Sequence, residues 1–231
     1  MLDPRDRVVM ISGASRGIGR AVAERLLASG FLVSAGVREK RGLREDERLM
    51  VHRYDAESLE SAAEWVAATM ARFGRIQALV NAAGINPKAT LEDADEAPLD
   101  RMWEVNVKGP LRLSRLSLPH LRACGEGRVA TFASLSGKRV KNENVGYAIS
   151  KFAVLALNQA IRREGWDAGI RATAICPSFV ATDMTGWVKT VAPAEMIQPA
   201  DLARLTETML LLPANATVAE LLVNCRFEEL L

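Results

Sequence analysis

Tyr147 and Lys151 lie four residues apart, and Ser134 lies thirteen residues before the tyrosine. Residues four apart share one face of a helix. A phenol titrates near pH ~10, and a cation beside it favours the phenolate and lowers its pKa. The three side chains could therefore form a proton-transfer centre in which Lys151 adjusts Tyr147 and Ser134 hydrogen-bonds the oxygen that the tyrosine serves. The same spacing also arises in exposed helix pairs, so the interpretation depends on the rest of the chain.

A glycine-rich stretch at residues 12–19 follows an apolar run and opens an amphipathic segment. Gly13 permits a tight turn, Gly17 lets the backbone approach a phosphate, and Gly19 allows a helix to pack closely on a strand. The helix that follows presents free N–H groups and the positive end of its dipole. The stretch predicts a site for the pyrophosphate of a dinucleotide, although its spacing, Gly-x-x-x-Gly-x-Gly, differs from the common Gly-x-Gly-x-x-Gly fingerprint.

The end of the second apolar run bears on which dinucleotide binds. An acidic residue there would bind the ribose 2′-hydroxyl of NAD, but this chain has Val37 followed by Arg38. Arg38 and Arg16 could instead pair with a 2′-phosphate, which a guanidinium recognises through two hydrogen bonds. We therefore predict NADP(H) as the preferred cofactor. NAD(H) stays an alternative because Glu39 follows Arg38 directly.

Apolar runs alternate with amphipathic segments along the whole chain. We expect strands at 7–12, 31–37, 49–54, 76–80, 128–133, 170–175 and 219–224, and helices at 17–29, 58–72, 99–123, 147–163 and 201–212. Strands separated by helices of this length form a parallel sheet with helices on both faces. The predicted fold is α/β, a Rossmann-type doubly wound parallel sheet of about seven strands, in a single domain (1–231). We expect the charged segment 39–48 to be a solvated connection.

Composition narrows the classes of partner. A formal net charge of +2 gives no reason to expect a nucleic acid, and no apolar run approaches the ~20 residues that span a bilayer. Three cysteines without a Cys-x-x-Cys pattern and two histidines argue against disulfides and a metal site. The first residues lack the basic and apolar regions of a signal peptide. We expect a cytoplasmic protein that acts on a small molecule and binds no metal, nucleic acid or membrane.

The chain contains six sequence motifs. Each lies next to a predicted strand or helix that would position it. They are Ser12 with Gly13, Gly17 and Gly19; Asp55 after the third strand; Asn81-Ala82-Ala83-Gly84 after the fourth; Asn106 in the long helix; Ser134 with Tyr147 and Lys151; and the segment from Pro177 to Thr182. In this order, and with Ser12 in place of a threonine, the chain resembles the short-chain dehydrogenase/reductase family over nearly its whole length.

The resemblance implies a role for each residue. Tyr147 would protonate an alkoxide in a reduction, or remove a hydroxyl proton in an oxidation, while Ser134 hydrogen-bonds the substrate oxygen. Lys151 would lower the pKa of Tyr147 and contact the nicotinamide ribose, and Asn106 would hold a water that feeds protons toward Lys151. Ser136 is the competing candidate for the role of Ser134. The implied cofactor-binding residues are Gly13, Ser15, Arg16, Gly17, Ile18, Gly19, Arg38, Asp55 (at the adenine), Asn81, Ala82, Ala83, Gly84, Tyr147, Lys151, Pro177, and Val180 and Thr182 (at the nicotinamide carboxamide).

The chain departs from the family pattern after its sixth predicted strand. Ser178 replaces a usual glycine, and it could narrow the pocket, donate a hydrogen bond to substrate or have no consequence. The expected substrate lid, at about 183–199, is short. It could cover an apolar pocket or simply pack as a loop, with large apolar side chains at Met184, Trp187, Val188 and Met196. Residues 220–226 lack the Val-Asp-Gly-Gly ending frequent in tetrameric members.

We predict an NADP(H)-dependent oxidoreductase that transfers a hydride between nicotinamide and a carbonyl or secondary alcohol, with Tyr147 as general acid/base. The alternatives are a hydroxy-acid or amino-alcohol dehydrogenase of the same family and a non-catalytic NADP-binding sensor, since fold does not fix function. The complete proton-transfer set favours an enzyme. The resemblance also implies a homodimer or homotetramer, formed through the helices that begin at Leu99 and Tyr147.

Overall fold

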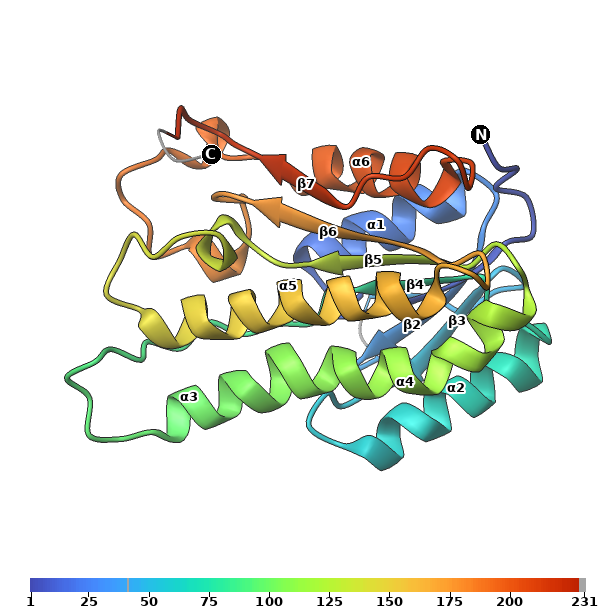
Figure 1. Cartoon of the computed structure of the whole chain (residues 1–231), viewed down its shortest axis with the longest axis horizontal. Helices are drawn as coiled ribbons and strands as arrows, with labels where there is room; N and C mark the ends of the chain where they lie inside the picture. The colour runs from blue at the N-terminus through green and yellow to red at the C-terminus, as the bar shows by residue number, and fades with distance from the viewer. Residues whose placement is uncertain (41, 229–231) are drawn as a thin grey trace.

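The structure is a computed structural model that describes residues 1–40 and 42–228. Parallel strands form the centre of this part of the chain (Figure 1): β1 (Val8–Ser12), β2 (Leu32–Val37), β3 (Leu49–Arg53), β4 (Ala78–Asn81), β5 (Arg128–Phe132), β6 (Arg171–Pro177) and β7 (Glu220–Val223). They make one seven-stranded sheet in the order β3-β2-β1-β4-β5-β6-β7. The predicted α/β fold is confirmed, including its seventh strand, which pairs with β6.

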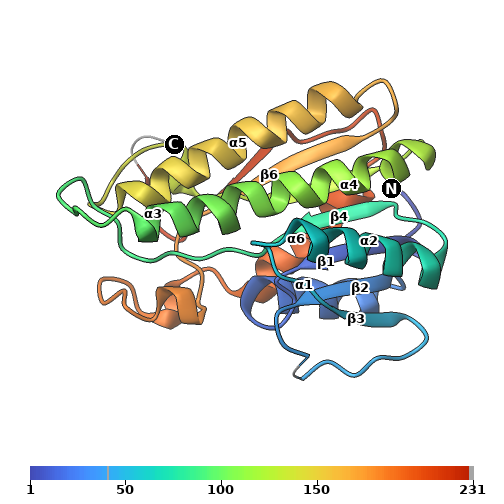
Figure 2. The ribbon, with the colours of Figure 1, turned by 90° about the horizontal axis from the view of Figure 1, so that it is seen from below.

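Helices cover both faces of the sheet (Figure 2). The helices α1 (Gly17–Ala28) and α6 (Pro199–Leu211) lie on one face, and α2 (Leu59–Phe73), α4 (Gly109–Ala123) and α5 (Val145–Gly165) lie on the other. Neighbouring residues of β1 are buried on opposite sides, because Val9 and Ile11 pack with Leu26 of α1 whereas Met10 packs in a separate cluster with Trp65 of α2. Strands buried on both faces have no polar side, which is why the sequence shows continuous apolar runs.

The helix predicted over 99–123 is divided into three parts. Helix α3 (Ala97–Met102) continues into a π-helical segment, η1 (Trp103–Lys108), and then into α4. Pro110 has no N–H to donate to the carbonyl of Asn106, four residues earlier. The N–H of Gly109 donates five residues back, to Glu104. The wider turn therefore lies at Asn106, and π-helical turns of this kind are frequent at functional sites.

The connection between β2 and β3 contains no helix among its described residues, 38–40 and 42–48, and most of them are exposed. This confirms the predicted solvated connection. Among the helices that the structure describes, none is both long and apolar enough to cross a membrane.

All strands end at the same edge of the sheet, where the arrows of β5, β6 and β7 point in Figure 1. The chain runs outward from β1 in both directions, to β2 and β3 on one side and to β4 and the later strands on the other. In sheets of this type, ligands bind in the crevice outside the carboxyl ends of the strands, at the point where the order reverses. That point lies between β1 and β4.

Candidate active site

The glycine-rich turn joins β1 to α1 at this edge. Gly13 and Gly17 have φ angles of +72° and +56°, a region that residues with a side chain rarely adopt. A Cβ on Gly13 would lie 2.8 Å from the Cα of Ala83, and a Cβ on Gly19 would lie 2.4 Å from the carbonyl oxygen of Gly13. Only glycine therefore lets the turn pack directly on the residues that follow β4.

The hydroxyl of Ser12 joins the same two strand ends. Its oxygen accepts the N–H groups of Ala82 at 3.1 Å and Ala83 at 3.2 Å. The hydroxyl donates in turn to the carbonyl of Val80 at 3.5 Å. Because a hydroxyl is all that these contacts require, serine can replace threonine in this motif.

A groove of about 1000 Å³, part of it open to solvent, runs over the turn and the ends of β1 and β4. It brings together most of the predicted cofactor residues, namely Gly13, Ser15, Arg16, Gly17, Ile18, Gly19, Arg38, Asp55, Ala82, Ala83, Gly84 and Thr182. The predicted Asn81, Tyr147, Lys151, Pro177 and Val180 are not part of this lining. Asn81 lies beneath it, where its amide donates to Ser114 at 3.3 Å and to Thr131 at 3.4 Å.

The beginning of α1 fits an anionic group. Arg16 precedes the helix without a side-chain capping hydrogen bond, and the first turn contains no acidic residue. The first N–H groups and the positive end of the helix dipole are therefore uncompensated by side chains. Gly17 faces Thr182 across the groove, since a Cβ on Gly17 would lie 3.3 Å from the Thr182 methyl group. The free N–H groups at this helix N-terminus fit the pyrophosphate of a dinucleotide.

Three arginines line the groove, and two of them form ion pairs within the protein. Arg16 pairs with Asp183 at 2.8 Å, and Arg101 pairs with Glu57 at 3.3 Å. Arg38 is exposed at the end of β2 and forms no ion pair with a residue that the structure describes. Of the two arginines predicted to face a 2′-phosphate, Arg38 thus has an uncompensated charge, whereas Arg16 is held by Asp183.

Ser134 and Tyr147 meet beyond the carboxyl end of β5. Ser134 precedes a short 3₁₀ helix, η2 (Leu135–Gly137), and its hydroxyl oxygen accepts the N–H of Ser136 at 3.1 Å. The Ser134 side chain also lies beside Tyr147, which is in the first turn of α5, and acts to lower the pKa of the phenol. Ser136 contributes its backbone to this arrangement, so Ser134 and not its competitor lies beside the phenol.

Burial dominates the ionisation of the Tyr147–Lys151 pair. It raises the pKa of Tyr147 to about 12, against the effect of the Ser134 side chain, and it lowers the pKa of Lys151 to about 8. The Lys151 ammonium lies 5.6 Å from the centre of the Tyr147 ring and donates to the carbonyl of Phe132 at 2.8 Å. The spacing correctly predicted that the two side chains are neighbours. In the protein by itself the pKa of Tyr147 lies above its ordinary value because desolvation of the phenol is the largest effect, and the predicted lowering by Lys151 stays a prediction.

Asn106 connects the π-helical segment to the loop after β4 and to α5. Its side-chain oxygen accepts the N–H of Ile85 at 2.8 Å, and its amide donates to the Ile85 carbonyl at 2.9 Å and to the Ser150 hydroxyl at 3.1 Å. The Ser150 hydroxyl donates to the carbonyl of Tyr147 at 2.8 Å. Asn106 therefore helps to position the turn of α5 that carries the phenol.

Asn106 and Lys151 both lie near Gly84, which lines the groove. A Cβ on Gly84 would lie 3.4 Å from the Asn106 side-chain oxygen and 3.9 Å from the Lys151 ammonium, both ordinary contact distances. The two polar side chains thus border one backbone position of the groove.

Comparison with known protein families shows to which family the chain belongs. A family model described as short chain dehydrogenase matches residues 7–191. The chain belongs to the short-chain dehydrogenase/reductase family. Members of this family are oxidoreductases that use a nicotinamide cofactor.

Individual relatives show how far the chain resembles other proteins of the family. It is 42% identical to agropine synthesis reductase of Rhizobium rhizogenes over 229 residues, which cover 96% of this chain and 53% of that protein, so it spans about half the length of that relative. It is 34% identical to 2-(R)-hydroxypropyl-CoM dehydrogenase of Xanthobacter autotrophicus, over 78% of this chain and 77% of the other. The structure of 3-ketoacyl-(acyl-carrier-protein) reductase from Brucella melitensis complexed with NADH is similar with a TM-score of 0.88 and 25% identity, over 96% of this chain and 98% of that one.

The Ser178 side chain hydrogen-bonds the C-terminal segment. Its hydroxyl donates to the Cys225 sulfur at 3.3 Å and accepts the Cys225 N–H at 2.9 Å. The hydroxyl is therefore engaged inside the protein, and its predicted alternative role as a donor to substrate is not supported.

The segment predicted as a lid follows Val180, which forms an isolated β-bridge with Ile197. It contains two short 3₁₀ helices, η3 (Asp183–Thr185) and η4 (Pro193–Glu195). Of the four apolar side chains predicted to cover a pocket or pack the loop, Val188 and Met196 are buried together, whereas 39% of Met184 and 60% of Trp187 are exposed. Val188 and Met196 therefore pack the loop, and a lid over a substrate pocket stays a prediction.

Sequence reasoning missed four residues that shape the site: Glu57, Arg101, Ser150 and Asp183. Asp183 directly follows the predicted Thr182, so adjacency was the one signal for it in the sequence. The partners of Glu57 and Ser150 are 44 residues away in both cases, and no local pattern could have indicated them.

Proposed function

We propose that the chain is an NADP(H)-dependent reductase of carbonyl compounds, or a dehydrogenase of secondary alcohols, with Tyr147 as general acid/base. The observation that carries this proposal is the position of Tyr147 beside both Ser134 and Lys151, near a groove with an uncapped helix N-terminus. A proton donor and a cofactor groove are the two parts that hydride transfer to a carbonyl requires.

The nicotinamide cofactor, when bound, supplies the hydride that ends on the carbonyl carbon. Ser134 would hydrogen-bond the carbonyl oxygen and Tyr147 would give it a proton, which balances the two-electron reduction to an alcohol. Because the pKa of Tyr147 is about 12, the phenol carries its proton at neutral pH and is ready to act as an acid. Lys151, bordering the same part of the groove as Asn106, would stabilise the phenolate that results until a solvent proton replaces the one transferred.

The preference for NADP(H) rests on the charges of the groove. No acidic residue lies at the end of β2, where one would bind the ribose 2′-hydroxyl of NAD. The uncompensated charge of Arg38 would pair with a 2′-phosphate instead. The similar Brucella structure is complexed with NADH, and both cofactors therefore belong in the test.

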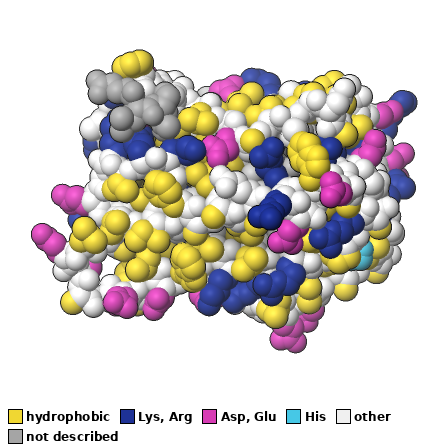
Figure 3. Space-filling view, in the orientation of Figure 1, with side chains coloured by type: hydrophobic (Ala, Val, Ile, Leu, Met, Phe, Trp, Pro, Cys, Tyr) yellow, Lys and Arg dark blue, Asp and Glu magenta, His cyan; other side chains and the backbone are white. Residues whose placement is uncertain are grey.

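We also propose a homodimer, or a homotetramer built from it, formed through α3, α5 and the segment between α3 and α4. Hydrophobic side chains gather over α3 and the first half of α5 (Figure 3), where Trp103, Ile149 and Phe152 are 40%, 44% and 45% exposed. Exposed apolar patches of this kind are typical of surfaces that bind another protein.

A panel of ketones, aldehydes and hydroxy acids, each offered with the reduced or oxidised form of both cofactors, tests this proposal. We expect NADPH oxidation with at least one carbonyl compound, and a larger enhancement of NADPH fluorescence than of NADH fluorescence on binding. Equal weak fluorescence responses and no turnover across the panel would support a non-catalytic binding protein instead.

A further inference from the structure

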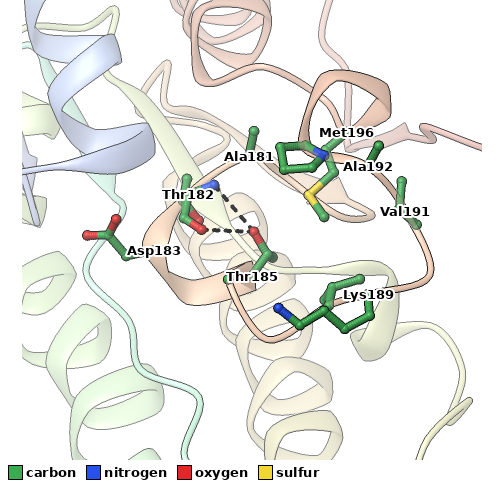
Figure 4. Close-up of a pocket in the computed structure, with 11 residues that line it drawn as sticks. Ala181, Thr182, Asp183, Thr185, Lys189, Val191, Ala192 and Met196 are labelled. Carbon is green, nitrogen blue, oxygen red and sulfur yellow. Dashed lines mark hydrogen bonds between the residues drawn. The ribbon is translucent and has the colours of Figure 1, made fainter.

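A hollow beneath the lid adjoins the cofactor groove. Residues of the segment 181–196 line it, and two of these, Thr182 and Asp183, also line the groove (Figure 4). It comprises about 890 Å³, part of it open solvent. Because the two linings share Thr182 and Asp183, a molecule bound in the groove could extend into this hollow.

One part of the wall of the hollow is apolar. Val188, Val191 and Met196 are buried together there, and Phe179 and Cys225 pack behind them. The Thr185 hydroxyl is engaged within the protein, because it hydrogen-bonds the carbonyls of Val180 at 2.5 Å and Thr182 at 3.0 Å. The hollow therefore offers a ligand hydrocarbon surface next to polar groups.

Two charged residues line the hollow, and one of them, Lys189, is unpaired among the residues that the structure describes. The Asp183 carboxylate points away from the other lining residues in Figure 4 and is paired with Arg16 at 2.8 Å. Lys189 is exposed and forms no hydrogen bond or ion pair with any residue in the described ranges 1–40 and 42–228. Its ammonium points toward Thr185 in Figure 4. A cation that is unpaired among the described residues thus borders apolar side chains, in a hollow that adjoins the groove.

The segment that carries Lys189 is held in place from the C-terminal side. Arg226 donates to the carbonyl of Thr190 at 2.6 Å and to Glu195 at 3.4 Å. Cys225 packs against the buried side chains of the lid and is bound to Ser178. The ammonium therefore extends from a positioned backbone, which lowers the entropic cost of binding an anion.

We propose that Lys189 binds a carboxylate of the substrate, so that the substrate class is oxo acids, or the corresponding hydroxy acids, whose carboxylate is separated from the reacting carbon by an apolar chain. The apolar wall would receive the chain, and the ammonium would form a charge-assisted hydrogen bond with the carboxylate. This inference rests on the proposed carbonyl reductase function, because the other end of the substrate must lie at Ser134 and Tyr147.

The test compares carbonyl compounds that differ only in charge. Rates with saturating NADPH are measured for 3-oxobutanoate, 4-oxopentanoate, 5-oxohexanoate and 4-formylbenzoate, and for the methyl ester of each. We expect kcat/KM to favour the acid over its ester for at least one chain length. Lys189→Met should lower kcat/KM for that acid by about ten- to a hundredfold and change the ester less than about twofold. Lys189→Arg should retain most of the preference.

A matched control removes a cation elsewhere. Arg204 lies on α6, is exposed, pairs only with Asp201 among the described residues, and does not line the hollow or the groove. Arg204→Met should leave the acid-to-ester ratio unchanged. Titration with pentanoate and pentanamide, followed by calorimetry, gives a readout without turnover, and pentanoate should bind tighter to the wild type but not to Lys189→Met.

The outcomes separate the two proposals. If esters are reduced as well as acids, or Lys189→Met affects both equally, the carboxylate site is refuted while the reductase stands. If neither acids nor esters are reduced and pentanoate does not bind, both proposals are refuted. If pentanoate binds through Lys189 without turnover of any carbonyl compound, the anion site stands and the reductase is refuted.

Discussion

Replacing Lys151 with methionine should change how the stability of the protein depends on pH. Lys151 is 6% exposed, and burial lowers its pKa from 10.5 to about 8. Below about pH 8, Lys151 is charged in both the folded and the unfolded protein. Burial of this charge lowers the free energy of unfolding over that pH range. As pH rises from about 8 to 10.5, the folded protein has released the proton while the unfolded chain still binds it, so the free energy of unfolding increases.

The size of this increase in the free energy of unfolding follows from the two pKa values of Lys151. Each pH unit between the folded and the unfolded pKa of Lys151 adds ~1.4 kcal/mol to the free energy of unfolding. The whole interval adds roughly 3 kcal/mol. Methionine has a similar length and no charge, so the Lys151→Met variant should lack the increase. Loss of the Lys151–Phe132 hydrogen bond would shift the stability of the variant at all pH values without giving it this slope.

Urea unfolding at intervals from pH 7 to 10, followed by tryptophan fluorescence, measures the difference. The wild type should gain stability relative to Lys151→Met above pH 8, and Tyr147 does not disturb the comparison because both proteins carry it. Lys88→Met is the matched control, since the Lys88 side chain is 73% exposed. Parallel stability curves for the wild type and Lys151→Met would refute the claim that Lys151 is desolvated in the folded protein.

Two further predictions concern the charges of the groove. Arg38→Asp should shift the NADPH/NADH ratio of kcat/KM toward NADH by about tenfold or more, because it removes the partner of the 2′-phosphate and adds one for a ribose hydroxyl; an unchanged ratio would show that Arg38 does not select the cofactor. Asp183→Asn should release Arg16 and tighten NADPH binding by no more than about fivefold, since the Arg16–Asp183 pair is largely exposed. Fluorescence titration should show this gain at low salt and little change for NADH, and an equal gain for both cofactors would count against a role of Arg16 at the 2′-phosphate.

The sequence was sufficient to predict the sheet and the cofactor turn because both depend on local patterns. Strands such as β1 are continuous apolar runs, and Gly13 and Gly19 have a fixed place between the first strand and the first helix. The π-helical turn at Asn106 could not be predicted in the same way. A wider turn inserted in a helix leaves the amphipathic pattern on either side intact, so the segment 99–123 has the pattern of one helix.

The parts of the site that escaped prediction depend on contacts between distant segments. Arg16 and Asp183 are separated by 167 residues and Ser178 and Cys225 by 47, yet these contacts determine which groups are free to bind a ligand. The helical spacing of Tyr147 and Lys151 predicted their proximity but not their burial. Their pKa values are set by the surrounding residues of β5, β6 and η2, which the spacing alone does not describe.

The rate of a single turnover with Tyr147→Phe tests the central claim most directly. Excess enzyme with bound NADPH is mixed with the best carbonyl substrate of the panel, and loss of NADPH absorbance is followed by stopped flow. We predict that the variant binds NADPH as the wild type does and oxidises it about a hundredfold more slowly or worse, because the substrate oxygen loses its proton donor. Oxidation at the wild-type rate by Tyr147→Phe would contradict the assignment of Tyr147 as the general acid.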